Sequence, residues 1–354
     1  MDSKPFEFLT QLLETPSPSG YEHRIQAVVR DYVGKFADSV KTDLHGNVIA
    51  GRNTDSSMRV MLAGHCDQIG MVVSHIDDRG FLYAQTIGGW DPQQLIGQRM
   101  SVWPQGGTAN GIPAVIARKP IHLLKDDERK QVVKIEDLWL DIGATSAEQA
   151  NELVQVGDPV TLQLGFQAMQ NNMANSPGMD NRTGLWVVLE ALRRAGPNLN
   201  CAAFAVSTVA EEIGLRGAKT SAYGIDPQIG IAVDVTHATD CPTIDQRQLG
   251  KISLGGGPVV FRGPNMNHRI VERLQSVASK CRIDIQPAAL GRAAPNDSNA
   301  LQVTRGGVAT GLVSIPNRYM HSAVETTCLD DLDNAADLLA EFLNSLRSDD
   351  DFTP

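Results

Sequence analysis

The stretch VMLAGHCDQIGMVV, residues 60–73, combines a strand-like apolar run with ionisable side chains. An apolar run typical of a buried strand is interrupted by His65, Cys66 and Asp67, and then resumes. Ionisable side chains are costly to remove from water, so they need partners or a function where a buried strand ends. In open α/β sheets, ligands bind at the carboxyl ends of the strands. The stretch therefore predicts a buried strand that leads into a functional site.

The flanking segments predict an α/β domain. Residues 5–14 and 23–36 show the three- and four-residue apolar spacing of amphipathic helices. NVIAG and RVMLAG follow as short strands, and later helical patterns such as GLWVVLEALRRA alternate with near-continuous apolar strands such as CAAFAVSTV and IGIAVDV. This alternation favours a largely parallel sheet with helices on both faces.

The pattern changes between about Val72 and Phe166. Short alternating or β-branched runs, such as GFLYAQTIGG and DPVTLQL, are separated by turns rich in Gly, Pro and Asp, which is typical of a small all-β unit. We therefore expect a catalytic domain made of residues 1–71 and 167–354, and an inserted β domain at residues 72–166. A chain of 354 residues is long enough for two cores.

Composition excludes several classes of protein. With 42% hydrophobic and 20% charged residues the chain is neither disordered nor fibrous. A net charge of −10 opposes nucleic-acid binding. There is no apolar run of 18 residues and no export signal at the N-terminus, which predicts no membrane anchor. The five cysteines are scattered and odd in number, which favours reduced thiols and a cytoplasmic protein.

Ionisable residues recur where the expected strands end. They come from five segments: His65 and Asp67 after VMLAG, Asp180 just before the helix GLWVVLEAL, Glu211 and Glu212 after CAAFAVSTV, Asp234 after IGIAV, and His321 after ATGLVSIPNRYM. Strand ends meet at one edge of an α/β sheet, so we expect these side chains to converge. Imidazoles and carboxylates without a thiolate cluster favour a hydrolytic centre with two divalent ions over a structural zinc site.

Two spacings add detail. Residues two apart in a strand face the same side, so Asp67 can accept the second ring N–H of His65 and orient it as a ligand. Neighbouring Glu211 and Glu212 point apart, so one can bind metal while the other acts as general base on the attacking water.

Each motif also has a structural alternative. His65 and Asp67 can be a pair that caps a strand, Glu211 and Glu212 an acidic first helical turn, and Asp180 a helix cap. These alternatives are independent of one another, whereas a metal site accounts for all the residues together. Among the other histidines, only His237 is close enough in sequence to Asp234 to be a candidate for the surroundings of the site.

The chain resembles a known family over nearly its whole length. The matching stretches are HCDQIGMVVSHIDDRGFLYAQTIGGW, MDNRTG, AEEIGLRGAK, AVDVTHATD, GGGPVVFRGPN and SIPNRYMHSAVE. They closely resemble the tetrahedral aminopeptidases, which include glutamyl aminopeptidases and related cytosolic metallopeptidases.

The resemblance implies a role for each candidate residue. His65 and Asp234 look like ligands of one ion, Glu212 and His321 of the other, and Asp180 bridges both. Glu211 matches the general base, and Asp67 matches the residue that orients His65. Two divalent cations per chain are expected, zinc first, with cobalt or manganese as alternatives.

The resemblance also implies fold, substrate and assembly. The expected fold is a phosphorylase/hydrolase-like mixed α/β sheet flanked by helices, with an inserted small β-barrel or PDZ-like domain that serves oligomerisation or substrate access. The expected substrates are peptides with a free N-terminus, and dimers would assemble into a tetrahedral dodecamer. Two stretches depart from the family pattern, RAAPNDSNA around Asp297 and QAMQNNMANSPGMDN before Asp180. Neither removes a ligand.

Two other functions are kept as alternatives. Some relatives carry an endoglucanase label, and a pair of carboxylates can serve a glycoside hydrolase. Only 5% of the residues are aromatic, however, which leaves few platforms for sugar binding. A peptide-binding scaffold without turnover is the second alternative, and the complete set of candidate ligands with Glu211 opposes it.

Overall fold

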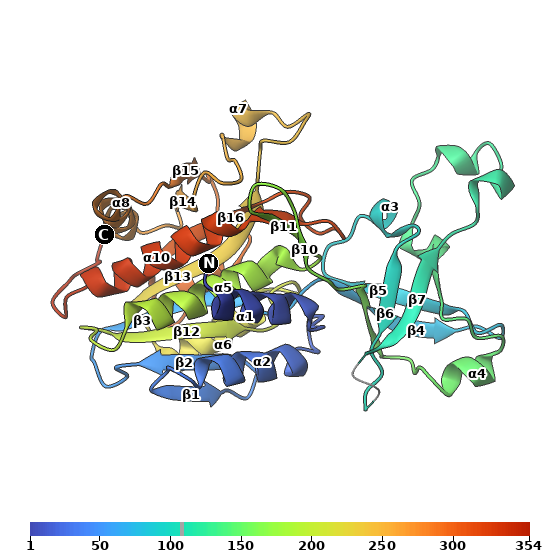
Figure 1. Ribbon diagram of the computed structural model, residues 1–354, viewed down its shortest axis with the longest axis horizontal. Helices are drawn as coiled ribbons and strands as arrows, with labels where there is room; N and C mark the ends of the chain where they lie inside the picture. The colour runs from blue at the N-terminus through green and yellow to red at the C-terminus, as the bar shows by residue number, and fades with distance from the viewer. Residues whose placement is uncertain (107–109) are drawn as a thin grey trace.

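The computed structural model describes residues 1–106 and 110–354, and its larger unit is built on an eight-stranded mixed sheet (Figure 1). In spatial order the strands are β1 (Ser39–Thr42), β2 (Val48–Arg52), β12 (Ala202–Thr208), β3 (Arg59–His65), β13 (Ile229–His237), β16 (Ala309–Asn317), β14 (Val259–Arg262) and β15 (Gln286–Ala289). The four central strands, from β12 to β16, run parallel. Antiparallel pairs occur only towards the two sides of this sheet.

Helices cover both faces of the sheet. One face packs against α1 (Ser3–Glu14), α2 (His23–Val33), α5 (Met179–Ala195), α8 (His268–Cys281) and α10 (Leu329–Ser345), and the other against α6 (Arg216–Ile225) and α9 (Asp297–Gln302). The alternation along β3 shows why its apolar run is continuous. Val60 and Leu62 enter the first core, while Met61 and Ala63 enter the second. The prediction of a largely parallel sheet with helices on both faces is confirmed for the four central strands.

Glycine allows α5 to lie directly against β3. A Cβ added at Gly64 would come within 2.7 Å of the backbone nitrogen of Leu185, and one added at Gly184 would come within 2.7 Å of the carbonyl oxygen of Val233. Real Cβ atoms do not approach backbone atoms so closely, so both positions need glycine. This close packing brings the N-terminal turn of α5, which carries Asp180, to the end of β3.

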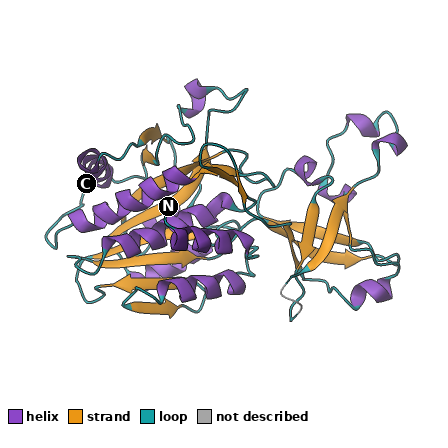
Figure 2. Cartoon of the chain, in the orientation of Figure 1, coloured by secondary structure: helices purple, strands orange, loops and turns teal. Residues whose placement is uncertain are grey.

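The smaller unit is a closed barrel of six antiparallel strands (Figure 2). Around the barrel the strands are β4 (Gly70–Ile76), β5 (Leu82–Ile87), β8 (Trp139–Asp141), β7 (Ile112–Ala117), β6 (Arg99–Val102) and β9 (Pro159–Leu162). The barrel has its own apolar core, which includes Leu82, Leu140 and Val160. It carries the short helices α3 (Pro92–Leu95) and α4 (Ala147–Asn151). A β-barrel insertion is thus confirmed, while its likeness to a PDZ domain and its boundaries at 72 and 166 stay predictions.

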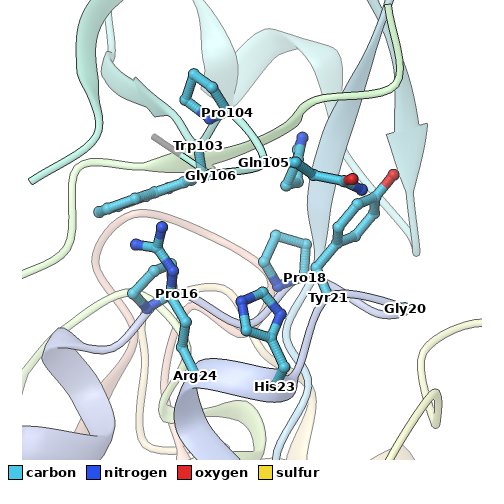
Figure 3. A pocket seen from close by; sticks show the side chains of 11 residues that line it. Pro16, Pro18, Gly20, Tyr21, His23, Arg24, Trp103, Pro104, Gln105 and Gly106 are labelled. Atoms are coloured by element: carbon cyan, nitrogen blue, oxygen red, sulfur yellow. The ribbon is translucent and has the colours of Figure 1, made fainter. Parts of the chain in front are cut away.

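The barrel contacts the larger unit through the segment around the start of α2. The hydroxyl of Tyr21 donates to the carbonyl oxygen of Gly157 at 2.7 Å, and the guanidinium of Arg24 lies 5.2 Å from the ring centroid of Trp103. These side chains line a pocket of ≈ 400 Å³ between the two units, together with Pro16 and Pro18 (Figure 3). A hydrogen bond and a cation–π contact therefore join the two units.

A small third sheet lies near the junction and was not predicted. It consists of β10 (Gln167–Ala168), β11 (Met173–Asn175) and β17 (Thr326–Cys328), with β11 in the middle. The antiparallel pairing of β11 with β17 joins the segment before Asp180 to the segment after His321. A last short helix, α7 (Gln246–Leu249), projects from the loop after β13.

Within residues 1–106 and 110–354, the structure contains no helix both long and apolar enough to cross a membrane.

Candidate metal centre

Strands β3 and β12 end side by side, which places two loops against each other. His65 is paired in register with Thr208, so the residues that follow both strands emerge together. The carboxylate of Asp67 accepts the backbone N–H groups of Glu211 at 3.1 Å and Glu212 at 3.2 Å. Asp67 therefore fixes the loop that carries the two glutamates.

The side chain of Asp67 is itself held from several sides. It is fully buried, and the hydroxyl of Ser19 donates to it at 2.6 Å. Burial alone would raise the pKa of Asp67, but hydrogen bonding and the charge of His65 lower it. Asp67 thus stays ionised in the interior.

His65 is oriented through its Nδ1 atom. This atom lies 3.0 Å from the backbone oxygen of Asp67 and 3.4 Å from its Oδ1 atom. The strand ends at His65, so Asp67 lies in the following loop and offers its main-chain carbonyl as well as its carboxylate. Nε2 is left to face the cluster of carboxylates.

Asp180 lies between the two histidines. Its Oδ1 atom is 3.2 Å from Nε2 of His65, and its Oδ2 atom is 3.2 Å from Nε2 of His321. Burial alone would raise the pKa of Asp180, but hydrogen bonding from the two imidazoles lowers it well below the usual range. One ionised carboxylate therefore joins two neighbouring groups of ligand atoms.

The other carboxylates complete these two groups. Asp234 Oδ1 lies 3.8 Å from His65 Nε2, and Glu212 Oε2 lies 3.6 Å from His321 Nε2. Glu211 Oε2 lies 3.7 Å from His65 Nε2. In two sets, the potential ligand atoms lie within 4.8 Å of one another, and both sets contain His65: one adds Asp180 and Glu212, the other Glu211 and Asp234. His321 joins the site through Asp180 and Glu212.

The residues of this edge fit bound cations. Burial raises the pKa of Asp234 to about 8, and the nearby charge of Asp180 adds to the shift. Burial likewise raises the pKa of Glu211 and Glu212 well above the usual range. In the described part of the chain, the buried Oε1 atom of Glu212 has no hydrogen-bond partner. Divalent cations would compensate this surplus of buried carboxylates and occupy the free oxygen.

The structure places all seven predicted residues at the same edge of the sheet. His65 is the last residue of β3, and Glu211 and Glu212 follow β12. Asp234 lies inside β13, which agrees with the predicted strand IGIAVDV but places it before the strand end and not after it. The ladder between β3 and β13 ends at Ala63 and Ala232, so the two strands separate before His65 and Asp234, whose side chains both reach the site. Cys66 points into the apolar core. His237 is exposed and belongs to a neighbouring cavity.

A further carboxylate, that of Glu325, belongs to the site. It lies in the motif SIPNRYMHSAVE, but no role was predicted for it from the sequence. It is 1% exposed, and its two oxygens accept the backbone N–H of Asp180 at 2.9 Å and of His321 at 2.7 Å. Burial raises its pKa to about 8. Its place directly before β17, which pairs with β11, explains how it reaches both residues. An acid within the apolar stretch SAVETTCL was the available sequence signal.

Asp297, in the departing stretch RAAPNDSNA, also lies near the site. It is 3% exposed, and the hydroxyl of Thr208 donates to its Oδ2 atom at 2.6 Å. Burial raises its pKa to about 6. This acid therefore adds to the negative charge around His65.

The fold and this edge together define a peptidase-like class: an α/β domain with a candidate metal site of histidines and carboxylates, interrupted by a β-barrel. The family model of M42 glutamyl aminopeptidases matches residues 46–338, and the chain belongs to this family. It is accordingly a hydrolase of the aminopeptidase type.

Three relatives illustrate the similarity. A protein of Pyrococcus furiosus named lysyl aminopeptidase is 38% identical over 99% of both chains. The crystal structure of a TET aminopeptidase from a marine sediment archaeon of the Thaumarchaeota is 34% identical, with a TM-score of 0.91 over 97% of both chains. The Pyrococcus horikoshii TET1 peptidase, described as able to form a tetrahedron or a large octahedral shell, is 30% identical, with a TM-score of 0.84 over 97% of this chain and 100% of its own.

Proposed function

We propose that the chain is a metal-dependent aminopeptidase that uses two cations to hydrolyse the N-terminal residue of a peptide. The observation that carries this proposal is Asp180, whose two oxygens each face a different histidine at 3.2 Å. We assign His65 and Asp234 to one cation, Glu212 and His321 to the other, and Asp180 to both. Zinc is the first choice, with cobalt or manganese as alternatives, since N/O ligands accept all three.

When bound, the two cations supply Lewis acidity, which lowers the pKa of a water molecule and polarises the scissile carbonyl. Glu211 acts as general base. Its Oε2 atom lies 3.7 Å from Nε2 of His65, beside the assigned ligands, where it can take the proton of the attacking water. Because burial raises its pKa, it holds that proton and can pass it to the leaving amine. The carboxylate-rich edge favours the positively charged α-amine of a substrate, which suits a free N-terminus.

The inserted barrel is proposed to serve assembly or substrate access. Its segment between β7 and β8 exposes the apolar side chains of Ile121, Leu123 and Val132, each by more than 60%. Such side chains suit contacts with other copies. We propose homodimers that assemble into a tetrahedral dodecamer, in the cytoplasm, where the five free cysteines would stay reduced. Sedimentation velocity tests the assembly: a mass near twelve chains is expected, and a monomer would refute it.

One experiment tests the reaction. Metal-loaded protein is incubated with aminoacyl-p-nitroanilides, an N-acetylated control and carboxymethylcellulose, with and without a chelator. Release from free-amine substrates alone, abolished by chelation, is expected. Glu211→Gln should lower kcat by about 10²- to 10⁴-fold and retain both ions. Chelator-resistant cleavage of cellulose by wild type and by Glu211→Gln would instead identify a glycoside hydrolase.

A further inference from the structure

A cavity of ≈ 740 Å³ opens beside the metal ligands. The ligand side chains form one part of its lining, and residues of β13, β14, β15 and β16 form much of the rest. Apolar side chains also line the cavity: Leu249 is 56% exposed, Met320 is half-buried, and Ile252 and Leu312 lie buried in its wall. A substrate whose N-terminal amine reaches the ligands can place its first side chain here.

We propose that this cavity binds the side chain of the substrate's N-terminal residue, and that it selects apolar residues of leucine or methionine size over lysine and arginine. This inference rests on the proposed aminopeptidase function and names its substrate class. The apolar surfaces of Leu249 and Met320, which are still in contact with water, favour an apolar side chain because both surfaces lose that contact on binding.

The distribution of charge around the cavity supports exclusion of cations. In the described part of the chain, every carboxylate in the lining belongs to the group around the metal ligands. The remaining charged side chain is Arg292, which is exposed, and His237 is the other ionisable group. A lysine side chain would therefore lose water without gaining a counter-ion and would meet the like charge of Arg292.

An acidic side chain is the second choice of this cavity. It would meet Arg292 as a counter-ion, but an exposed ion pair contributes little to binding. Its carboxylate would also lose hydration beside the apolar lining. The expected order is therefore apolar, then acidic, then basic, which separates this chain from the activity named for its lysyl aminopeptidase relative.

The first test compares substrates on the metal-loaded, full-length protein. The p-nitroanilides of leucine, methionine, glutamate, lysine and arginine are compared by kcat/KM. We expect leucine and methionine to exceed lysine by about tenfold or more, the range that pocket contacts commonly give. A rate for lysine equal to or above that for leucine would overturn the proposal.

The second test changes Arg292. Arg292→Gln should lower the leucine-to-lysine ratio about threefold, and Arg292→Glu should lower it about tenfold, chiefly through a lower KM for lysine. Arg129→Gln removes an exposed arginine of the barrel as a matched control and should leave the ratio unchanged. If both Arg292 variants behave like this control, Arg292 does not discriminate and the charge argument is refuted.

A binding measurement separates this inference from the proposed function. Calorimetry on metal-loaded Glu211→Gln compares the Kd of Leu-Ala with that of Lys-Ala without turnover. Tighter binding of Leu-Ala is expected. If it is observed while wild type hydrolyses no aminoacyl reporter, the proposed function fails and the cavity's selectivity stands. If hydrolysis is sensitive to chelator but Lys-Ala binds equally or more tightly, the selectivity fails and the function stands.

Discussion

The carboxyl edge of the large sheet and the interior of the barrel bury opposite kinds of side chain. The edge buries Asp67, Asp180, Asp234 and Glu325 around His65, each less than 9% exposed. The barrel core is formed by apolar residues such as Leu82 and Leu140. The barrel is therefore stabilised by the loss of apolar surface from water, whereas the edge depends on counter-ions. Removing cations should therefore affect the edge and leave the barrel intact.

Asp180→Asn should have the largest effect. The amide keeps the size of the side chain but loses the negative charge that lies between the two histidines. Both cations should therefore bind weakly, and kcat/KM should fall by about 10³-fold or more. Metal content by mass spectrometry and steady-state kinetics measure this. Retention of two ions with near-normal activity would contradict the bridging role.

Glu325→Gln should have the next largest effect. An amide offers one acceptor in place of two, so either Asp180 or His321 loses its backbone partner, and metal affinity should fall by about 10- to 100-fold. Asp331→Asn is a matched control, because Asp331 is also buried and accepts two backbone N–H groups, those of Gly255 and Gly257. Cobalt titration followed by absorption should show weaker binding in the first variant only. Equal losses in both would mean a purely structural effect.

Raising the pH should destabilise the metal-free protein. Asp234 and Glu325 have pKa values of about 8 in the folded chain, against about 4 when unfolded. Between pH 4 and 8 the folded state therefore binds more protons, and the free energy of unfolding falls as pH rises. With chelator, the Tm should drop by about 5 °C or more between pH 5.5 and 8.

Bound zinc should remove this fall, because cations hold the same carboxylates in their ionised form. The control is therefore the same pair of melting curves with zinc in place of chelator. An identical slope in both conditions would show that these carboxylates do not govern the pH dependence.

A substitution in the barrel should have the smallest effect on the site. Leu140→Ala removes a side chain that is 1% exposed from the barrel core, which should lower the free energy of unfolding by about 2–5 kcal/mol. Because the barrel core contains none of the assigned ligands, metal affinity should stay within about twofold of wild type. A loss of metal would mean that the two regions are coupled.

The sequence predicted the parts of the fold that local patterns control. The apolar run of β3, the two N-terminal helices and the β character of the insertion follow from residue spacing. Residue spacing does not encode pairing between distant segments. Such pairing determines the antiparallel strands at the two sides of the large sheet, the order of the barrel strands and the β10–β11–β17 sheet. Helix α6 was missed because RGAKTSAYGI has few apolar residues.

The sequence predicted those site residues that lie at the ends of neighbouring strands. His65 ends β3, and Glu211 and Glu212 follow the adjacent parallel strand β12, so their convergence could be expected from topology alone. Glu325 could not be found in this way, because it accepts hydrogen bonds from backbone groups that only the β11–β17 pairing brings together. The cavity beside the site was also beyond prediction, since its lining comes from several loops.

The central claim is that Asp180 lies between two cations. Crystals of zinc-loaded protein measured at the zinc absorption edge test it most directly, because anomalous difference maps locate each ion. Two peaks per chain are predicted, about 3.5–4 Å apart, one between His65, Asp234 and Asp180, the other between His321, Glu212 and Asp180. A single peak, or peaks remote from Asp180, would contradict the account.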